Sequence, residues 1–423
     1  MSPPPNQNEA FTHRALLQRF VHDDEPGRAR ARFGALTLFS HFQPIISLTH
    51  ARIVGHEGLL RAQDADGRLL PPPQLLTQAR EEGALELLDR LSRALHVRNA
   101  GSGGEGWLFL NMHPEVFVRA AELDCGGFLA ELLSGSRIPL RHLVIEVLEA
   151  AIDDGSRLSE AVAYLRQSGC LIALDDFGAG HSNFDRVWQL SPEIVKLDRS
   201  FALQAEQDAR VRRLLPRIAA LLHEAGALVL LEGIETETQA MIALEADIDL
   251  AQGYWFARPQ AETLPIHQPS KRAELLWQQH ETERRGSQRA LRQRIEPYER
   301  AIDLGAALLA NGQSVEEACA EFLALPQAEV CYLLDAEGRQ VGENVWRRDL
   351  CNLDRRRFAP MSGADGARWS RRSYFRRAIE HFGRVQVTRP YLSSASGCLC
   401  VTVSISLSRD CAICVLCGDV RWE

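Results

Sequence analysis

The chain has 423 residues, of which 45% are hydrophobic and 25% are charged, and a formal net charge of −8 at pH 7. This length exceeds one ordinary domain, and the composition is typical of a soluble globular protein. The acidic balance argues against bulk nucleic-acid binding. No apolar run approaches the ~20 residues that span a bilayer, and the Pro-rich start lacks the apolar core of a signal peptide. We therefore expect a cytoplasmic protein with no membrane partner.

Short apolar runs alternate with amphipathic segments over the first two-thirds of the chain. The runs at 108–110 and 171–174 are typical of buried parallel strands. Helices are predicted at 73–82, 156–168 and 209–225, each followed by a glycine. Alternating strands and helices over roughly 230 residues predict an α/β fold, a TIM-like (β/α)8 barrel whose C-terminal strand ends meet at one mouth.

Polar groups stand at the ends of the predicted barrel strands. In chain order they are Glu57, Asn111, Glu146, Asp175-Asp176, Lys196, Glu232 and Gln252. Taken singly, each could equally be a turn residue or a helix N-cap. Taken together, like charges in one barrel mouth would repel each other unless a cation compensated them. The repeated acidic groups therefore predict a divalent-metal site.

Ordered sequence blocks between about residues 38 and 260 carry a family resemblance. They are Phe42-Gln43-Pro44-Ile45, Glu57-Gly58-Leu59-Leu60-Arg61, Leu110-Asn111, Glu146-Val147-Leu148-Glu149, Asp175-Asp176-Phe177-Gly178, Lys196-Leu197-Asp198, Glu232-Gly233-Ile234-Glu235 and Gln252-Gly253-Tyr254. The stretch resembles the EAL-domain family of cyclic di-GMP phosphodiesterases. It differs in that Gly58 stands where the family usually has alanine and Leu148 where it usually has threonine. We expect Gly58 to loosen the Glu57 ligand and to alter the rate rather than the chemistry.

The resemblance implies hydrolysis of cyclic di-GMP to linear pGpG with two Mg²⁺ or Mn²⁺ ions, and inhibition by Ca²⁺. The implied metal ligands are Glu57, Asn111, Glu146, Asp175, Asp176 and Glu232, with Asp175 shared by both ions. Hard oxygen ligands suit these cations. The implied catalytic residues are Lys196, Glu232 and Glu57. Lys196 orients water or neutralises charge, and Glu232 is a ligand or a proton acceptor.

Several of these residues have a purely structural alternative. Lys196 could instead be a structural ion pair among carboxylates, and we expect Lys196→Ala to leave folding largely intact. The resemblance makes Arg61 a phosphate contact and Gln43 a reader of a guanine edge. The alternatives are a rim salt bridge and a turn amide. Gln252 resembles a glutamine that lines the substrate site.

Two further acidic residues, Glu149 and Glu235, resemble groups that brace the loop at 177–182, which contains two glycines. Those glycines could equally serve only a tight strand-to-helix connection.

The expected domains are an N-terminal extension at 1–37, the barrel at 38–268, a helical linker at 269–312 and a second domain at 313–423. Pro297 is expected to end or kink the linker helix. The linker also contains apolar residues at heptad-like spacing, namely Leu291, Ile295, Tyr298, Ile302 and Leu309. They indicate either a seam of a homodimer or a helix packed on its own chain.

The second domain is predicted to be a smaller α+β domain with a helix at 315–323. The segments at 369–378 and 388–391 resemble Cache or PAS-like sensor domains. In such sensors Arg371, Tyr374, Arg376 and Tyr391 would hold a small anionic or zwitterionic molecule. The alternative is a structural or dimerisation domain. Its cysteines Cys411, Cys414 and Cys417 repeat at a spacing that alternates strand faces, so buried reduced cysteine is favoured over a metal site.

The sequence favours a phosphodiesterase regulated by its C-terminal domain. The alternatives are a cyclic di-GMP receptor without activity and a scaffold that binds no nucleotide.

Overall fold

A computed structural model describes the chain in two compact units, Met1–Thr282 and Glu283–Glu423. The described residues are 19–25, 28–100, 106–113, 116, 136, 138–148, 155–180, 184–348 and 363–422. No helix among them is long and apolar enough to cross a membrane.

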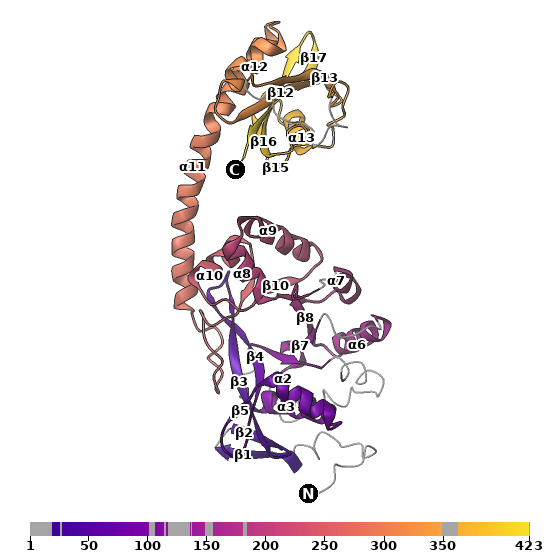
Figure 1. Ribbon diagram of the computed structural model, residues 1–423, viewed down its shortest axis with the longest axis vertical. Helices are drawn as coiled ribbons and strands as arrows, with labels where there is room; N and C mark the ends of the chain where they lie inside the picture. The colour runs from indigo at the N-terminus through magenta and orange to yellow at the C-terminus, as the bar shows by residue number, and fades with distance from the viewer. Residues whose placement is uncertain are drawn as a thin grey trace. The chain divides into compact units, whose positions relative to one another are not determined.

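The first unit is a closed barrel of eight strands (Figure 1). They are β3 (Leu36–Ser47), β4 (Arg52–Gln63), β6 (Trp107–Asn111), β7 (Leu143–Leu148), β8 (Leu171–Phe177), β9 (Ile194–Leu197), β10 (Leu228–Leu231) and β11 (Leu250–Ala251). Their order is β3-β11-β10-β9-β8-β7-β6-β4, and the pairing of β3 with β4 closes the ring. Neighbouring strands are parallel except that β3 is antiparallel to both β4 and β11. The predicted TIM-like barrel is confirmed.

Helices connect the barrel strands, and three short strands extend the sheet beyond the barrel. The helices are α2 (Pro72–Glu81), α3 (Leu85–Asn99), η1 (Leu140–His142), α6 (Gly155–Gln167), α7 (Phe184–Leu190), α8 (Arg199–Gln207), α9 (Ala209–Glu224) and α10 (Glu237–Glu245). The short strands are β1 (Val21–Glu25), β2 (Arg28–Phe33) and β5 (Leu69–Leu70). The helices predicted at 73–82, 156–168 and 209–225 match α2, α6 and α9 within one residue at each end.

The barrel strands present alternate residues to two separate apolar clusters. One cluster joins strand residues such as Leu108 and Ile145 to residues of the surrounding helices, for example Leu222 of α9. The other takes residues from the barrel strands themselves, among them Phe109 and Val144. Because successive side chains of a strand point to opposite faces, the second cluster fills the barrel interior. This inner layer is the floor on which the site is built.

Helix α11 (Lys271–Ala310) is continuous and contains Pro297 in its interior. Pro297 was expected to end or kink this helix. It does not end it, so that part of the prediction is wrong. The missing N–H leaves one helical carbonyl without its donor, at a cost of about 3 kcal/mol. Burial of Tyr298, Ile302 and Leu309 in a core cluster of the second unit offsets that cost. These seam residues therefore pack on their own chain, while Leu291 is exposed.

The second unit is a smaller α+β domain, as predicted. Its strands are β12 (Ala328–Leu334), β13 (Gln340–Trp346), β14 (Gln386–Val387), β15 (Tyr391–Leu392), β16 (Leu399–Arg409) and β17 (Ala412–Arg421). They form one sheet in the order β13-β12-β17-β16-β14, with β15 paired to β16. The helix predicted at 315–323 is α12 (Val315–Leu323), and α13 (Ser373–Glu380) was not predicted as a helix.

The cysteines of strand β17 lie on opposite faces of its sheet, as their spacing predicted. Cys414 packs against the cluster that contains residues of α11 and α12, whereas Cys417 belongs to the cluster around Tyr374. Cys411 is exposed in the turn before β17. The three thiols therefore do not converge on one ion, and all three are free.

Candidate functional site

On each parallel barrel strand, a polar residue of the barrel mouth follows a residue of the inner apolar layer by two positions in the sequence. That layer includes Ile45, Phe109, Val144, Ala173, Ile194, Leu230 and Leu250. Side chains two residues apart on a strand share a face. The residues two positions further along the parallel strands are Asn111, Glu146, Asp175, Lys196, Glu232 and Gln252. They form a polar layer directly above the apolar one, as the strand-end pattern predicted.

Glu57 joins this layer although it is not at a strand end. It lies within β4, which continues to Gln63, so the sequence-based placement at a terminus is wrong for this residue. β4 pairs with β6 only as far as Gly58, whereas its pairing with β3 runs on to Gln63. The residue opposite Glu57 on β3 is Gln43. Glu57 thus stands where β4 leaves the barrel wall, which places it at the mouth.

Asp175 and Asp176 are consecutive, yet both carboxylates reach the same place. In a regular strand they would point to opposite faces. The β8–β9 pairing shifts register between Leu174 and Phe177, and Asp176 has a positive φ of 57°. This bulge turns Asp176 back towards the mouth. Ligand oxygens of Asp175, Asp176 and Glu232 all lie within 4.8 Å of one another.

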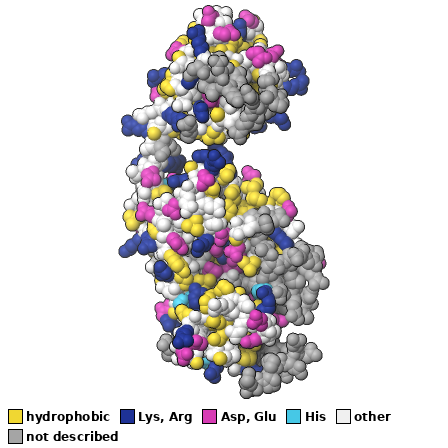
Figure 2. Space-filling model, viewed as in Figure 1, with side chains coloured by type: hydrophobic (Ala, Val, Ile, Leu, Met, Phe, Trp, Pro, Cys, Tyr) yellow, Lys and Arg dark blue, Asp and Glu magenta, His cyan; other side chains and the backbone are white. Residues whose placement is uncertain are grey.

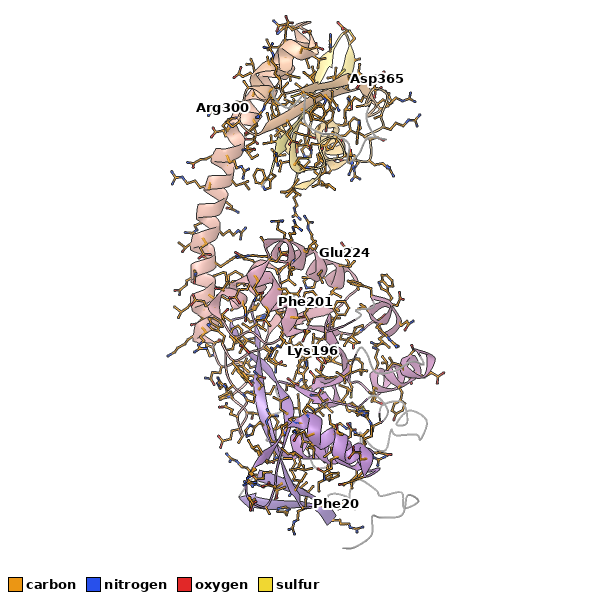
Figure 3. The ribbon with its side chains drawn as sticks, in the orientation of Figure 1. Phe20, Lys196, Phe201, Glu224, Arg300 and Asp365 are labelled. Carbon is orange, nitrogen blue, oxygen red and sulfur yellow. The ribbon has the colours of Figure 1, made fainter. Side chains whose placement is uncertain are left out.

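Lys196 is the cation at the centre of this acidic layer (Figure 3). Its ammonium Nζ lies 3.0 Å from Asp175 Oδ1 and 2.6 Å from Glu232 Oε1. It also contacts Glu146 Oε1, and Glu57 Oε1 is 3.9 Å away. Only 1% of Lys196 is exposed. In the space-filling view, acidic side chains gather where Figure 3 labels Lys196 (Figure 2).

The site holds more negative charge than Lys196 can balance. Burial raises the pKa of Glu146 well above its ordinary value and that of Glu232 to about 8, although Lys196 opposes both shifts. Burial and repulsion by Asp175 raise the pKa of Asp176. Burial alone would lower the pKa of Lys196, but attraction by the surrounding carboxylates outweighs it and the pKa is raised. Further positive charge would stabilise this cluster.

Amides orient Glu57 from two sides. Asn111 Nδ2 donates to Glu57 Oε1 at 3.0 Å, and Gln252 Nε2 donates to Glu57 Oε2 at 2.7 Å. Gln252 Nε2 also lies 3.2 Å from Gln43 Oε1, and Gln43 donates to the carbonyl of Ala257. Among the described residues, the buried oxygens Gln252 Oε1 and Glu146 Oε2 have no hydrogen-bond partner. Such oxygens are suitable ligands for a hard cation.

Arg61 lies on β4 beyond Glu57 and is half-buried. Burial lowers the pKa of Arg61, and the nearby Tyr254 and Glu57 oppose that shift. Within the described part of the chain, its guanidinium makes one hydrogen bond, from Nη1 to the carbonyl of Leu60 at 2.9 Å. The sequence pattern assigned no role to Tyr254, which follows Gln252 and Gly253. Tyr254 is 48% exposed, and its ring lies under the guanidinium of Arg258, whose central carbon is 4.5 Å from the ring centre.

The loop after Asp176 requires glycine at one of its two glycine positions. Gly178 has a positive φ of 97°, and a Cβ there would lie 2.1 Å from Phe201 Cε2. Gly180 has open space around it and no such φ. Of the two bracing residues, Glu149 lies outside the described residues, and Glu235 is exposed. The bracing role of both stays a prediction.

Gly58 has a packing reason that the sequence did not reveal. A Cβ built on Gly58 would lie 2.7 Å from Cγ of His96, which comes from α3 and is 2% exposed. The His96 ring bonds Ser40 Oγ at 2.9 Å and Ser92 Oγ at 3.1 Å. Burial lowers its pKa to about 3, so the ring stays neutral. His96 therefore occupies the space that an alanine side chain would need beside Glu57.

We expect Gly58→Ala to destabilise the protein by about 1–3 kcal/mol, because the ring of His96 cannot move without losing its hydrogen bonds. In the double variant Gly58→Ala/His96→Ala, the two losses should be less than additive by about 1 kcal/mol or more. Urea denaturation of the four proteins measures this coupling. Additive losses would show that Gly58 and His96 do not compete for the same space.

The comparisons with known proteins agree with this geometry. The family model "EAL domain" matches residues 28–259, more than half of the chain. The chain belongs to the EAL domain family.

Among curated relatives, the cyclic di-GMP phosphodiesterase RocR of Pseudomonas aeruginosa is 29% identical over 231 residues, which is 53% of this chain and 57% of RocR. The uncharacterized EAL-domain protein YkuI of Bacillus subtilis is 27% identical over 344 residues, which is 79% of this chain and 82% of YkuI. The signaling protein YkoW, also of Bacillus subtilis, is 26% identical over 241 residues, which is 55% of this chain and 30% of YkoW. The chain thus spans about half or less of RocR and YkoW.

A solved structure is similar in fold over most of the chain. The crystal structure of the Bacillus subtilis YkuI protein, in complex with substrate c-di-GMP and calcium, has a TM-score of 0.78 and 22% identity. The match covers 91% of this chain and 96% of that one. It shows that both units have the YkuI fold.

Proposed function

We propose that this protein hydrolyses cyclic di-GMP to linear pGpG with divalent cations. The observation that carries the proposal is the convergence of four carboxylates on the buried Lys196 at one barrel mouth, namely Glu57, Glu146, Asp175 and Glu232. A fifth carboxylate, Asp176, is grouped with Asp175 and Glu232. Membership of the EAL family supports it, as do the relative named as a cyclic di-GMP phosphodiesterase and the YkuI crystal described with that nucleotide and calcium.

The residues present fit a pair of Mg²⁺ or Mn²⁺ ions. Carboxylate and amide oxygens are the ligands these ions prefer, and the site has excess negative charge and buried oxygens without partners. Glu57, Asn111, Glu146 and Asp175 would hold one ion, and Asp175, Asp176 and Glu232 the other. When bound, the ions would lower the pKa of water and stabilise charge on the phosphodiester.

The protein residues would position water and substrate. Lys196, fixed by its carboxylate contacts, would hold the attacking water and offset charge on the phosphate. Glu232, whose pKa burial raises to about 8, would accept a proton or serve as a ligand. Arg61 has N–H donors suited to a phosphate oxygen. Gln43 and Gln252 would contact the guanine and line the site.

Product analysis tests the proposal and separates it from its alternatives. Purified full-length protein with Mg²⁺ or Mn²⁺ should convert cyclic di-GMP to pGpG. EDTA should stop the reaction and added metal should restore it, while Ca²⁺ should permit binding and inhibit turnover. Tight nucleotide binding without product in either metal would favour the receptor function. Absence of binding, measured by calorimetry, would favour a scaffold.

The remaining expectations belong to the same proposal. The C-terminal domain would adjust barrel activity or the geometry of a homodimer, and the protein would act in the cytoplasm. The domain boundaries at 37/38, 268/269 and 312/313 stay predictions. Comparing product formation by full-length protein and by protein without residues 313–423 would test regulation.

A further inference from the structure

The second unit contains a pocket that the proposed reaction does not use. It has an empty volume of about 330 Å³, part of it open to solvent. Four aromatic residues line it: Tyr332 of β12, Trp369, Tyr374 of α13 and Tyr391 of β15. Its polar lining includes Asp419 of β17 and Arg372, together with Gln340, Asn344, Ser393 and Ser394. Of the residues that the sequence suggested, Tyr374 and Tyr391 line the pocket, whereas Arg371 and Arg376 do not.

The aromatic residues form a continuous wall. Ring centres lie 6.5 Å apart for Tyr332 and Trp369, 6.1 Å for Tyr332 and Tyr374, and 6.3 Å for Tyr374 and Tyr391. Their faces carry the negative end of the ring quadrupole, which attracts cations. Arg372 already places its guanidinium 5.8 Å from the centre of the Tyr391 ring. Because Arg372 is exposed, this positive group belongs to the edge of the pocket.

Asp419 places a buried carboxyl group against this wall. It is 3% exposed, and its Oδ1 accepts hydrogen bonds from Thr402 Oγ1 at 2.7 Å and Tyr332 OH at 3.4 Å. Within the described residues, no lysine, arginine or histidine forms an ion pair with it. Burial, followed by repulsion from Glu329, raises its pKa to about 7 even though these hydrogen bonds oppose the shift.

A second buried carboxylate, Glu329, adds negative charge near Asp419. Glu329 of β12 is 4% exposed, and its Oε2 has no hydrogen-bond partner within the described part of the chain. It adjoins Val330, which pairs directly with Asp419 across the sheet. Two buried acids on neighbouring strands create a negative potential, which disfavours an anionic ligand. Among the residues that line the pocket, Asp419 is the only carboxylate, which is fewer than a divalent metal site usually has.

We propose that this pocket binds a small molecule with an ammonium group, which lies on the aromatic wall and pairs with Asp419. The ammonium would supply the missing positive charge and gain both a charge-assisted hydrogen bond and cation–π attraction. Free alkylamines and amino acids share this group. An amino acid would in addition direct its carboxylate to Arg372.

Calorimetric titration of the full-length protein with propylammonium, alanine and propionate tests the proposal. The two ammonium compounds should bind and propionate should not. Asp419→Asn keeps the shape of the side chain and the hydrogen bond from Thr402. It should weaken the binding of both ammonium compounds by about tenfold or more. Asp410→Asn is the matched control, because Asp410 is an exposed carboxylate in the turn between β16 and β17. It should leave binding unchanged.

Two more variants complete the test. If the natural ligand is an amino acid, Arg372→Gln should weaken the binding of alanine but not that of propylammonium. If it is an amine, Arg372→Gln should weaken the binding of neither compound. Trp369→Leu should weaken the binding of both ammonium compounds several-fold, and it provides a second test if Asp419→Asn fails to fold. The proposal is overturned if no ammonium compound binds with a dissociation constant below about 10 mM. It is equally overturned if propionate alone binds, or if both Asp419→Asn and Trp369→Leu fold and bind as the unchanged protein does.

Discussion

Replacing Glu57 with glutamine is expected to lower pGpG formation at least about 100-fold. Both carboxylate oxygens of Glu57 accept hydrogen bonds from amide N–H groups, one from Asn111 and one from Gln252. Glutamine has nearly the same shape but turns an N–H donor towards one of those donors and removes a charge from the proposed metal site. Chromatographic separation of pGpG from cyclic di-GMP, at saturating Mn²⁺, measures the loss.

Metal binding should change together with the rate. Calorimetric titration with Mn²⁺ alone is expected to show weaker affinity in Glu57→Gln, and this readout does not depend on turnover. The control is Glu224→Gln, because Glu224 is an exposed carboxylate on α9 (Figure 3). It should match the unchanged protein in both measurements. Unaltered Mn²⁺ affinity and unaltered product formation in Glu57→Gln would show that Glu57 neither binds the metal nor takes part in the reaction.

The barrel and most of its polar layer could be predicted from the sequence, because both follow from the alternation of side chains along a strand. Each buried run ends with an apolar residue in the interior and a polar one two positions later, as in Ala173 and Asp175. The same pattern could not place Glu57 correctly, since it is followed by more strand. Nor could it predict the bulge at Asp176, which depends on a register shift relative to β9.

Packing between elements distant in sequence was beyond the reach of pattern analysis. His96 on α3 meets Gly58 on β4 through tertiary contacts alone, so the glycine could be interpreted only as a departure from the family pattern. The C-terminal pocket combines side chains from several elements, and its carboxylate, Asp419, has no sequence signal apart from its place in an apolar strand. The aromatic members Tyr374 and Tyr391 were found because their segments resemble Cache or PAS-like sensor domains.

The largest combined effect on rate and stability is expected for Lys196→Ala. The sequence-based expectation that folding stays largely intact has to be revised, because Lys196 is 1% exposed and contacts Glu146, Asp175 and Glu232. Removing the cation leaves those buried carboxylates without compensation. In EDTA, the free energy of unfolding should fall by about 3–5 kcal/mol. Urea denaturation measures this, and Lys271→Ala, an exposed lysine at the start of α11, is the control.

Divalent cations separate the structural role of Lys196 from its catalytic one. Mn²⁺ should stabilise Lys196→Ala more than it stabilises the unchanged protein, because it supplies positive charge to the same carboxylates. If Lys196 also positions water and phosphate, the Mn²⁺-stabilised variant remains at least about 100-fold slower in pGpG formation although it is folded. Recovery of the normal rate with Mn²⁺ would show that Lys196 acts only as a structural ion-pair partner. An unchanged urea midpoint in EDTA would instead mean that the acidic layer does not depend on its buried cation.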